Sequence, residues 1–174
     1  MLSSILAQMP WQSPSVDYHA IAPEIILAGG ICLVILVDLF TSESRKWITA
    51  TLTGFVMLGA LVPILTLAVD DVNVRSLFDG RYVVDEFSLV MKGIFLLAGY
   101  VIVLLSSSHV EEGDYWRGEY WFLLLSSLLG MVMMASSRDL VSVFVALEFL
   151  SIPAYMLAAW RKRDAKSNEA GMKY

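Results

Sequence analysis

The sequence is poor in the residues that carry redox, metal and nucleotide chemistry. It holds one cysteine, Cys32, and two histidines, His19 and His109. A single cysteine excludes a disulfide within the chain, and the widely separated histidines do not match the spacing of a metal-ligand set. The chain also lacks a glycine-rich phosphate loop and a Gly-x-Ser-x-Gly nucleophile elbow. We therefore predict no metal-binding and no cofactor-binding residue in it.

Charged residues are scarce as well, and apolar residues take their place. Asp, Glu, Lys and Arg make up 17% of the 174 residues, and hydrophobic residues make up 57%. A soluble domain is about 45–50% apolar, so the excess indicates a membrane protein. Lipid offers no partner for backbone polar groups, so each long apolar run is predicted to be an α-helix.

About 20 apolar residues in a helix cross a hydrocarbon core of about 30 Å. We predict an all-α fold, a polytopic transmembrane bundle with about five complete spans and the start of a sixth. Residues 1–174 are expected to form a single membrane domain. The predicted spans cover residues 23–40, 47–69, 87–108, 119–136 and 139–160, and the next begins at residue 166.

Two connections between the spans carry specific turn signals. Asp79-Gly80 lies beside an alternating stretch in the loop over residues 70–86, which predicts a short hairpin. The connection "SSRD" between the fourth and fifth spans is very short. These two helices are therefore predicted to be antiparallel neighbours.

Cationic residues give the predicted orientation, because they gather on the cytoplasmic side of a membrane. With the N-terminus outside, the inner connections hold Arg45, Lys46, Arg117, Arg161, Lys162, Arg163 and Lys166. The outer connections hold Arg75, Arg81 and Arg138. We predict a multi-pass protein with its N-terminus outside.

Glu148 lies near the middle of the fifth predicted span. A charge at that depth costs about 2.5–3.5 kcal/mol on insertion scales and marks a functional site by default. At helical spacing Ser151 and Tyr155 share its face, and Pro153 removes the hydrogen bond to the carbonyl of Phe149. We predict that Glu148 is a proton-carrying acid. The alternatives are a neutral glutamic acid that joins two helices, and a proline kink without a role.

Three further charges lie close to span ends. Lys92 is five residues into the third span, close enough to an end for its stem to snorkel. Pairing with a carboxyl group, or a place in a proton path, is the alternative. Asp38 is expected to be wetted by the inner headgroups. Lys173 lies about one turn into the sixth helix. In an isolated peptide, a lysine at this position would be interpreted as lying at the membrane interface.

Specific motifs support a resemblance to a known family. The segment "RDLVSVFVALEFLSIPAYMLAAWRKRDAKSNEAGMKY" contains Leu-Glu-x-Leu-Ser-x-Pro-x-Tyr followed by Lys-Arg-Asp-x-x-Ser-Asn-Glu-Ala-x-x-Lys-Tyr. It resembles subunit N of bacterial NADH–quinone oxidoreductase, the respiratory complex I. "APEIILAGGICLVILVDLF" and "DEFSLVMKGIFLLA" are also similar to this family. The resemblance covers nearly the whole chain.

The resemblance implies an antiporter-like, proton-translocating subunit, built from inverted repeats with broken helices. Electron transfer from NADH to quinone takes place elsewhere in such a complex. NADH, FMN, iron–sulfur clusters and quinone are therefore expected in other subunits. As a subunit of this complex, the chain is expected to be part of a translocase. By position Glu148 matches the essential acid of the family's fifth helix. Lys173 matches a lysine of the sixth helix on the proton path, and Lys92 is a weaker candidate.

The resemblance also implies partners and a location. The expected partners are the lipid bilayer and other membrane subunits of complex I, of the antiporter-like and quinone-module types. No nucleic acid is expected as a partner. The location is the bacterial inner membrane. The family's acid pairs with a lysine on a seventh helix, which lies beyond Tyr174, so residues 1–174 are not expected to hold a complete proton path. The alternatives are a subunit of a multisubunit cation/proton antiporter and a non-catalytic membrane scaffold.

Overall fold

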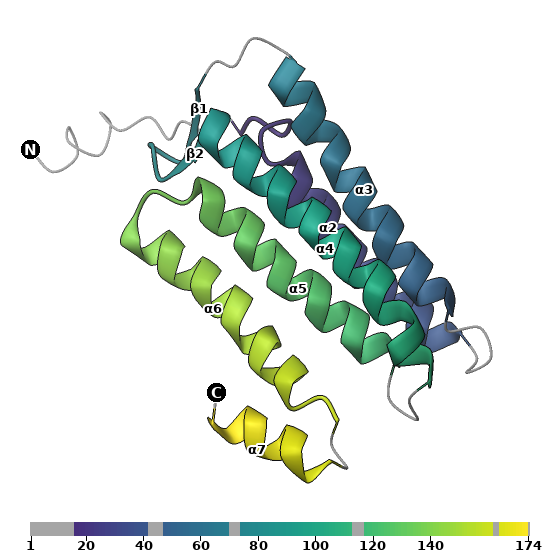
Figure 1. Ribbon diagram of the computed structural model, residues 1–174. Coiled ribbons are helices and arrows are strands. Elements are labelled where there is room, and N and C mark those ends of the chain that lie inside the picture. Colours follow the sequence, from purple (N-terminus) through teal and green to yellow (C-terminus); the bar gives the residue numbers. More distant parts are fainter. Residues whose placement is uncertain (1–15, 42–46, 70–73, 113–116, 162–163, 174) are drawn as a thin grey trace, which may run out of the picture.

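The computed structural model describes residues 16–41, 47–69, 74–112, 117–161 and 164–173, and within them the chain is a helical bundle with one small hairpin (Figure 1). The helices are α2 (Ala22–Phe40), α3 (Trp47–Val69), α4 (Glu86–Glu112), α5 (Arg117–Ser136), α6 (Leu140–Ala158) and α7 (Ala165–Lys173). The strands are β1 (Arg75–Leu77) and β2 (Tyr82–Val84). Five helices, α2 to α6, are long and apolar enough to cross a membrane. The predicted fold class, five spans and the start of a sixth, is confirmed.

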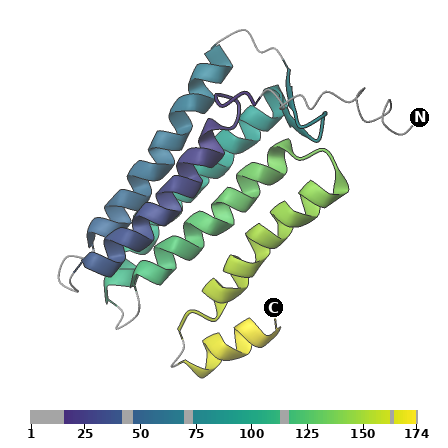
Figure 2. The ribbon, with the colours of Figure 1, turned by 180° about the vertical axis from the view of Figure 1, so that it is seen from behind.

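Helix α5 lies at the centre of the bundle. It packs against α2 and α4 on one side and α6 on the other, and α3 packs between α2 and α4 (Figures 1 and 2). Leu27, Met57, Leu96 and Leu125, one from each of α2 to α5, are fully buried where these helices meet. In an apolar 18-residue stretch of α5, 56% of the residues are buried inside the bundle. In the corresponding stretch of α6 only 11% are buried. Helix α6 is thus attached to the bundle by one face.

Local sequence signals explain where three of the spans begin. Pro23 occupies the first turn of α2, where a missing N–H costs no helical bond, and Glu24 follows in the same turn. Before α4, the Ser88 amide donates to Asp85 Oδ1 and the Asp85 amide donates to Ser88 Oγ, a reciprocal cap. Before α6, Asp139 Oδ1 accepts from the Ser142 amide over 3.2 Å.

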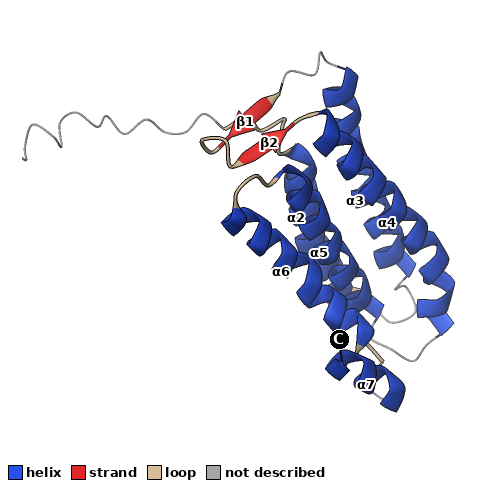
Figure 3. Cartoon of the chain, turned by 60° about the vertical axis from the view of Figure 1, so that its left-hand side comes forward, coloured by secondary structure: helices blue, strands red, loops and turns tan. Residues whose placement is uncertain are grey.

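The predicted hairpin is confirmed. Strands β1 and β2 pair antiparallel, with Leu77 opposite Tyr82, and Phe78, Asp79 and Gly80 in the turn all have positive φ. The hairpin lies at one end of the bundle, beside the start of α4 (Figure 3). It is also tied to the α5–α6 turn, because the Arg138 amide donates to the Arg81 carbonyl over 2.8 Å.

The predicted contact between the fourth and fifth spans is also confirmed. A Cβ atom placed on Gly130 of α5 would lie 2.8 Å from the Cα of Leu150 of α6 and closer still to its backbone nitrogen. Only a glycine therefore permits this approach of the two backbones.

The end of the bundle opposite the hairpin holds the short helix α7, which folds back beside the end of α6 (Figure 1). Ser167 of α7 donates to the Ala158 carbonyl over 2.9 Å, and Gly171 packs closely against Ala159. Of the residues that predicted the orientation, Arg45, Lys46, Lys162 and Arg163 lie outside the described residues.

Candidate functional site

Glu148 lies in an apolar groove between α5 and α6. The groove has a volume of about 390 Å³, and its lining residues are Phe122, Leu123, Ser126, Phe144, Val145, Glu148, Phe149, Ile152, Pro153 and Met156. Glu148 is half-buried there, and among the described residues its carboxyl group has no hydrogen-bond or ion-pair partner. When a carboxylate has apolar walls and no counter-charge, any cation or hydrogen-bond donor brought to it stabilises it strongly.

The polar surroundings of Glu148 differ from those that helical spacing predicted. Neither Ser151 nor Tyr155 lines the groove, and the Ser151 hydroxyl donates to the Leu147 carbonyl of its own helix over 2.6 Å. Ser126 of α5 is the other polar residue of the lining, and its hydroxyl donates to the Phe122 carbonyl over 2.9 Å. Pro153 also lines the groove.

Lys173 lies in the last turn of α7, and within the described part of the chain it forms no hydrogen bond or ion pair with Glu148. Its ammonium group forms an ion pair with Glu169, one turn earlier in the same exposed helix. Asp38, near the end of α2, is half-buried, with Gly118 packed against its carboxyl group. The roles predicted for Glu148 and Lys173 stay predictions.

Lys92 is fully buried, so the expectation that its stem snorkels to the interface is wrong. The alternative, pairing with a carboxyl group, is confirmed. Lys92 Nζ lies 2.7 Å from Glu24 Oε1, and the Glu24 side chain is itself only 12% exposed. The pair joins the first turn of α2 to the second turn of α4 at the hairpin end of the bundle.

Tyr82 of β2 completes this cluster. Its hydroxyl donates to Glu24 Oε1 over 2.6 Å, and Lys92 Nζ donates to the same hydroxyl over 3.2 Å. The ammonium also lies 5.2 Å from the centre of the Tyr82 ring. Burial, and next the Glu24 carboxylate, raise the pKa of Tyr82 above its ordinary value, so the phenol stays neutral and acts as a donor. We call Glu24, Tyr82 and Lys92 the hairpin-end cluster.

Sequence reasoning missed Glu24 and Tyr82 as members of this cluster, although one signal was present. The first and third spans of a serpentine membrane protein begin at the same membrane face. Glu24 and Lys92 lie in the first two turns of those spans, so they come to similar depths. Depth alone did not show that the two side chains face each other.

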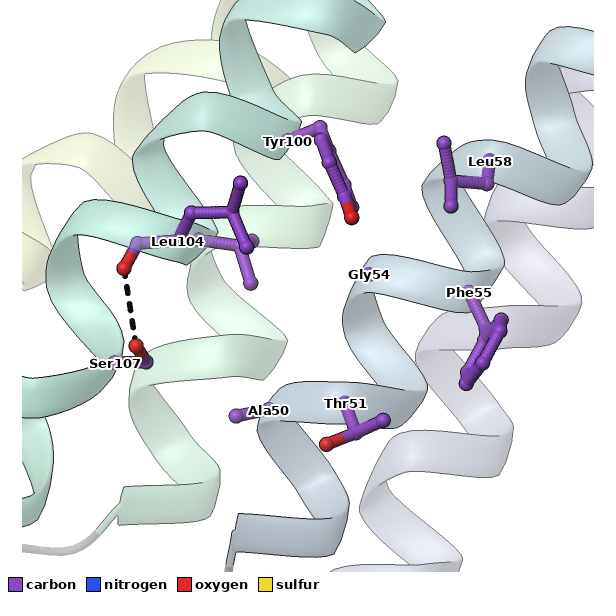
Figure 4. A pocket seen from close by; sticks show the side chains of 9 residues that line it. Ala50, Thr51, Gly54, Phe55, Leu58, Tyr100, Leu104 and Ser107 are labelled. Carbon is purple, nitrogen blue, oxygen red and sulfur yellow. Dashed lines mark hydrogen bonds between the residues drawn. The ribbon is translucent and has the colours of Figure 1, made fainter.

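A second cavity, of about 220 Å³, lies between α3 and α4 (Figure 4). Tyr100 points into it from α4 and passes close to Gly54 of α3, where a Cβ atom would lie 3.3 Å from the ring. The Ser107 hydroxyl at its margin donates to the Leu104 carbonyl of the same helix. The lining carries no Asp, Glu, Lys, Arg or His, and its polar side chains are the hydroxyls of Thr51, Tyr100 and Ser107.

Comparison with known proteins agrees with these features. A family model described as NADH:quinone oxidoreductase/Mrp antiporter, transmembrane, matches residues 137–174, the segment that contains Glu148 and Lys173. NADH-quinone oxidoreductase subunit N of Anoxybacillus flavithermus is 40% identical over 163 residues, which cover 92% of this chain and 32% of that protein. Subunit N of Thioalkalivibrio sulfidiphilus is 34% identical over 158 residues, which cover 91% and 32%.

The fold matches a solved structure as well. A chain of respiratory complex I from Thermus thermophilus with bound aureothin has a TM-score of 0.69 and 30% identity, covering 87% of this chain and 32% of that one. The bundle is therefore of the antiporter-like membrane subunit class. The chain belongs to the NADH-quinone oxidoreductase subunit N family, and it spans about a third of the length of the relatives it matches.

Proposed function

We propose that this chain is part of a proton-translocating membrane subunit of NADH–quinone oxidoreductase, in which Glu148 takes up and releases the proton. The observation that carries the proposal is Glu148 itself, an acid near the middle of a membrane span with no partner among the described residues. A structural acid would be expected to hold a hydrogen bond to a neighbouring helix, since an unpaired polar group in hydrocarbon is costly.

The exposed part of α6 supports the same reading. Phe144, Val145 and Ile152, which line the groove from α6, are exposed, and the relatives are about three times as long as the matched region. We infer that further helices of the subunit cover this groove and bring a basic side chain to Glu148. Lys173, at the end of α7, is proposed to lie farther along the same path.

Other parts of the proposal rest on family membership. The redox cofactors NADH, FMN and iron–sulfur clusters, and the quinone, are proposed to bind other subunits, which neighbour this one in the membrane. The location is proposed to be the bacterial inner membrane with the N-terminus outside. The hairpin end of the bundle is then the outer end.

The test replaces Glu148 with Gln in the assembled complex, in inverted membrane vesicles. NADH oxidation, complex content and NADH-driven acidification of the vesicle interior are measured together. We expect E148Q to assemble but to lose about tenfold or more of its acidification, because an amide cannot carry a proton. E119Q, which removes a glutamate from the first turn of α5, is the matched control. Normal acidification by assembled E148Q would overturn the proposal and leave a scaffold role.

A cation/proton antiporter is the second candidate, because the matching family model includes antiporter subunits. It predicts that acidification depends on Na⁺ or K⁺ gradients and persists when NADH oxidation is blocked. Vesicles tested with and without NADH, in Na⁺ and in choline buffer, separate the two functions.

A further inference from the structure

We propose that the hairpin-end cluster is a second protonatable site of this chain, in which Lys92 and Glu24 exchange and release a proton at the end of the bundle that carries the hairpin. The inference rests on the proposed function, since it assigns the cluster to proton translocation. It concerns residues on α2, α4 and β2, none of which lines the groove of Glu148.

The burial of the pair argues against stability as its main purpose. Lys92 is fully buried and Glu24 nearly so. Removing two charges from water is energetically costly, and apolar residues of similar volume stabilise such sites as well or better. Neighbouring buried positions, such as Leu89 and Leu96 of α4, show that this helix face accepts apolar side chains. The presence of an ion pair at these buried positions therefore indicates that Lys92 and Glu24 have a functional role.

The hydrogen bonding of the cluster leaves room for another proton. Glu24 Oε1 accepts from both Tyr82 and Lys92, whereas Oε2 is buried and accepts no hydrogen bond from the described residues. The buried Ser136 hydroxyl at the end of α5 also lacks a partner among them. It lies near the Tyr82 hydroxyl. Oε2 is thus an acceptor whose capacity is unused.

The proton balance of the site is simple. Over 2.7 Å, an N–H bond of the Lys92 ammonium breaks and an O–H bond forms on the Glu24 carboxylate, which converts an ion pair into a neutral amine and a carboxylic acid. The carboxylic acid then loses its proton to water, and the amine takes up another. No net charge is created in the first step, so it avoids the cost of an isolated buried ion.

Other charged groups lie close to the cluster. Asp85, just before α4, acts on Lys92 through space and is itself paired with Arg138 of the α5–α6 turn. Tyr82 is the hairpin residue that contacts the pair directly. Helix α3 contains no titratable residue, and the half of α5 nearest the hairpin contains none either.

The hairpin links the cluster to the helix of Glu148. Tyr82 forms an isolated bridge with Ser137, and the adjacent Arg81 carbonyl accepts from the Arg138 amide. A displacement of the α5–α6 turn would therefore move the Tyr82 hydroxyl relative to Glu24 and Lys92. Tyr82 is a positioning residue in this scheme, and Glu24 and Lys92 hold the proton.

The test compares two charge-balanced double variants in the assembled complex in inverted vesicles. E24Q/K92Q keeps polar side chains but no exchangeable charge, and E24K/K92E keeps an ion pair in reverse order. We expect E24Q/K92Q to oxidise NADH but to acidify the vesicles at least about fivefold less, and E24K/K92E to recover most of the loss. A merely structural pair predicts normal acidification by both, and that result would overturn the proposal.

A single variant covers the case in which the double variants fail to assemble. Y82F keeps the ring and the ion pair but deletes the donor to Glu24. Because the carboxylate loses a group that stabilises its charged form, the profile of acidification against the pH of the vesicle interior should move to higher pH. An unchanged profile with normal assembly would overturn the proposal.

The experiments distinguish failure of the hairpin-end site from failure of the role proposed for Glu148. Carbodiimide labelling of Glu24, followed by mass spectrometry, should rise several-fold at neutral pH in K92M, both alone and combined with E148Q. Loss of pumping in E148Q with normal pumping in E24Q/K92Q would remove the hairpin-end site only. The opposite pair of results would remove the role of Glu148 only.

Discussion

The hydroxyl of Ser127 in α5 donates a hydrogen bond to the carbonyl oxygen of Leu150 in α6 over 3.1 Å. The bond crosses between the helices one turn from Gly130, where the two backbones lie close together. Leu150 comes two residues after Glu148. The contact between α5 and α6 therefore sets the width and the polarity of the groove in which the acid lies.

Replacement of Gly130 by Ala should push α6 away from α5, because the added Cβ would overlap the backbone of Leu150. Overpacking of this kind costs about 1–3 kcal/mol. We expect a lower thermal midpoint for the complex and faster proteolysis after α5. Gly93 of α4 is the matched control, since a Cβ there meets nothing within 4 Å. Equal behaviour of G130A and G93A would contradict the close contact.

A pH effect is expected at the ion pair between Asp17 and Arg75. Arg75 lies 2.8 Å from Asp17 Oδ2, and the amides of His19 and Ala20 donate to Oδ1. Partial burial alone would raise the pKa of Asp17, but the Arg75 hydrogen bond and charge, with the two amides, lower it below 3.8. The pair therefore stabilises the fold fully above pH 3.8, and its contribution is lost as the pH falls through the lower value in the folded state.

The pair is partly exposed, so its contribution should stay below about 1 kcal/mol. Thermal midpoints of wild type and D17N, measured from pH 6 downward, should differ at the higher pH and converge in acid. D79N removes an exposed acid from the hairpin turn and serves as the control. A difference between wild type and D17N that persists unchanged into strong acid would be inconsistent with this assignment.

The cap of α6 gives a third prediction. The Asp139 carboxylate accepts from the Ser142 amide, and the contact with Ser142 is the main cause that lowers the pKa of Asp139. D139A should fray the first turn of α6, so that the Ser142 amide exchanges with solvent roughly tenfold faster. D139N retains a capping oxygen and should remain close to wild type. Equal exchange in both variants would show that the cap does not stabilise this turn.

Local sequence accounts for most of the helices and the hairpin. Runs of about 20 apolar residues can satisfy their backbone in lipid only as helices, so each of the five spans follows from composition. The hairpin follows from Asp79-Gly80, because that turn needs positive φ and glycine adopts it without strain. The pairing of α5 with α6 follows from the brevity of the connection between them.

The candidate sites were only partly predictable, because they depend on which helix faces meet. Glu148 was singled out as a charge in an apolar run, but Ser126, across the groove on α5, was not predicted to face it. Lys92 was singled out too, and yet its nearness to a span end suggested exposure. Its burial comes from Glu24, 68 positions earlier, and from a tyrosine on the hairpin.

By itself the sequence determined which segments cross the membrane, because transfer of apolar residues and backbone groups into lipid depends on local composition. Only the tertiary structure decided the partners of the charges within those segments. Rotation of each helix about its axis is set by packing against its neighbours, and that rotation turns Lys92 towards Glu24 and leaves Glu148 facing an open groove.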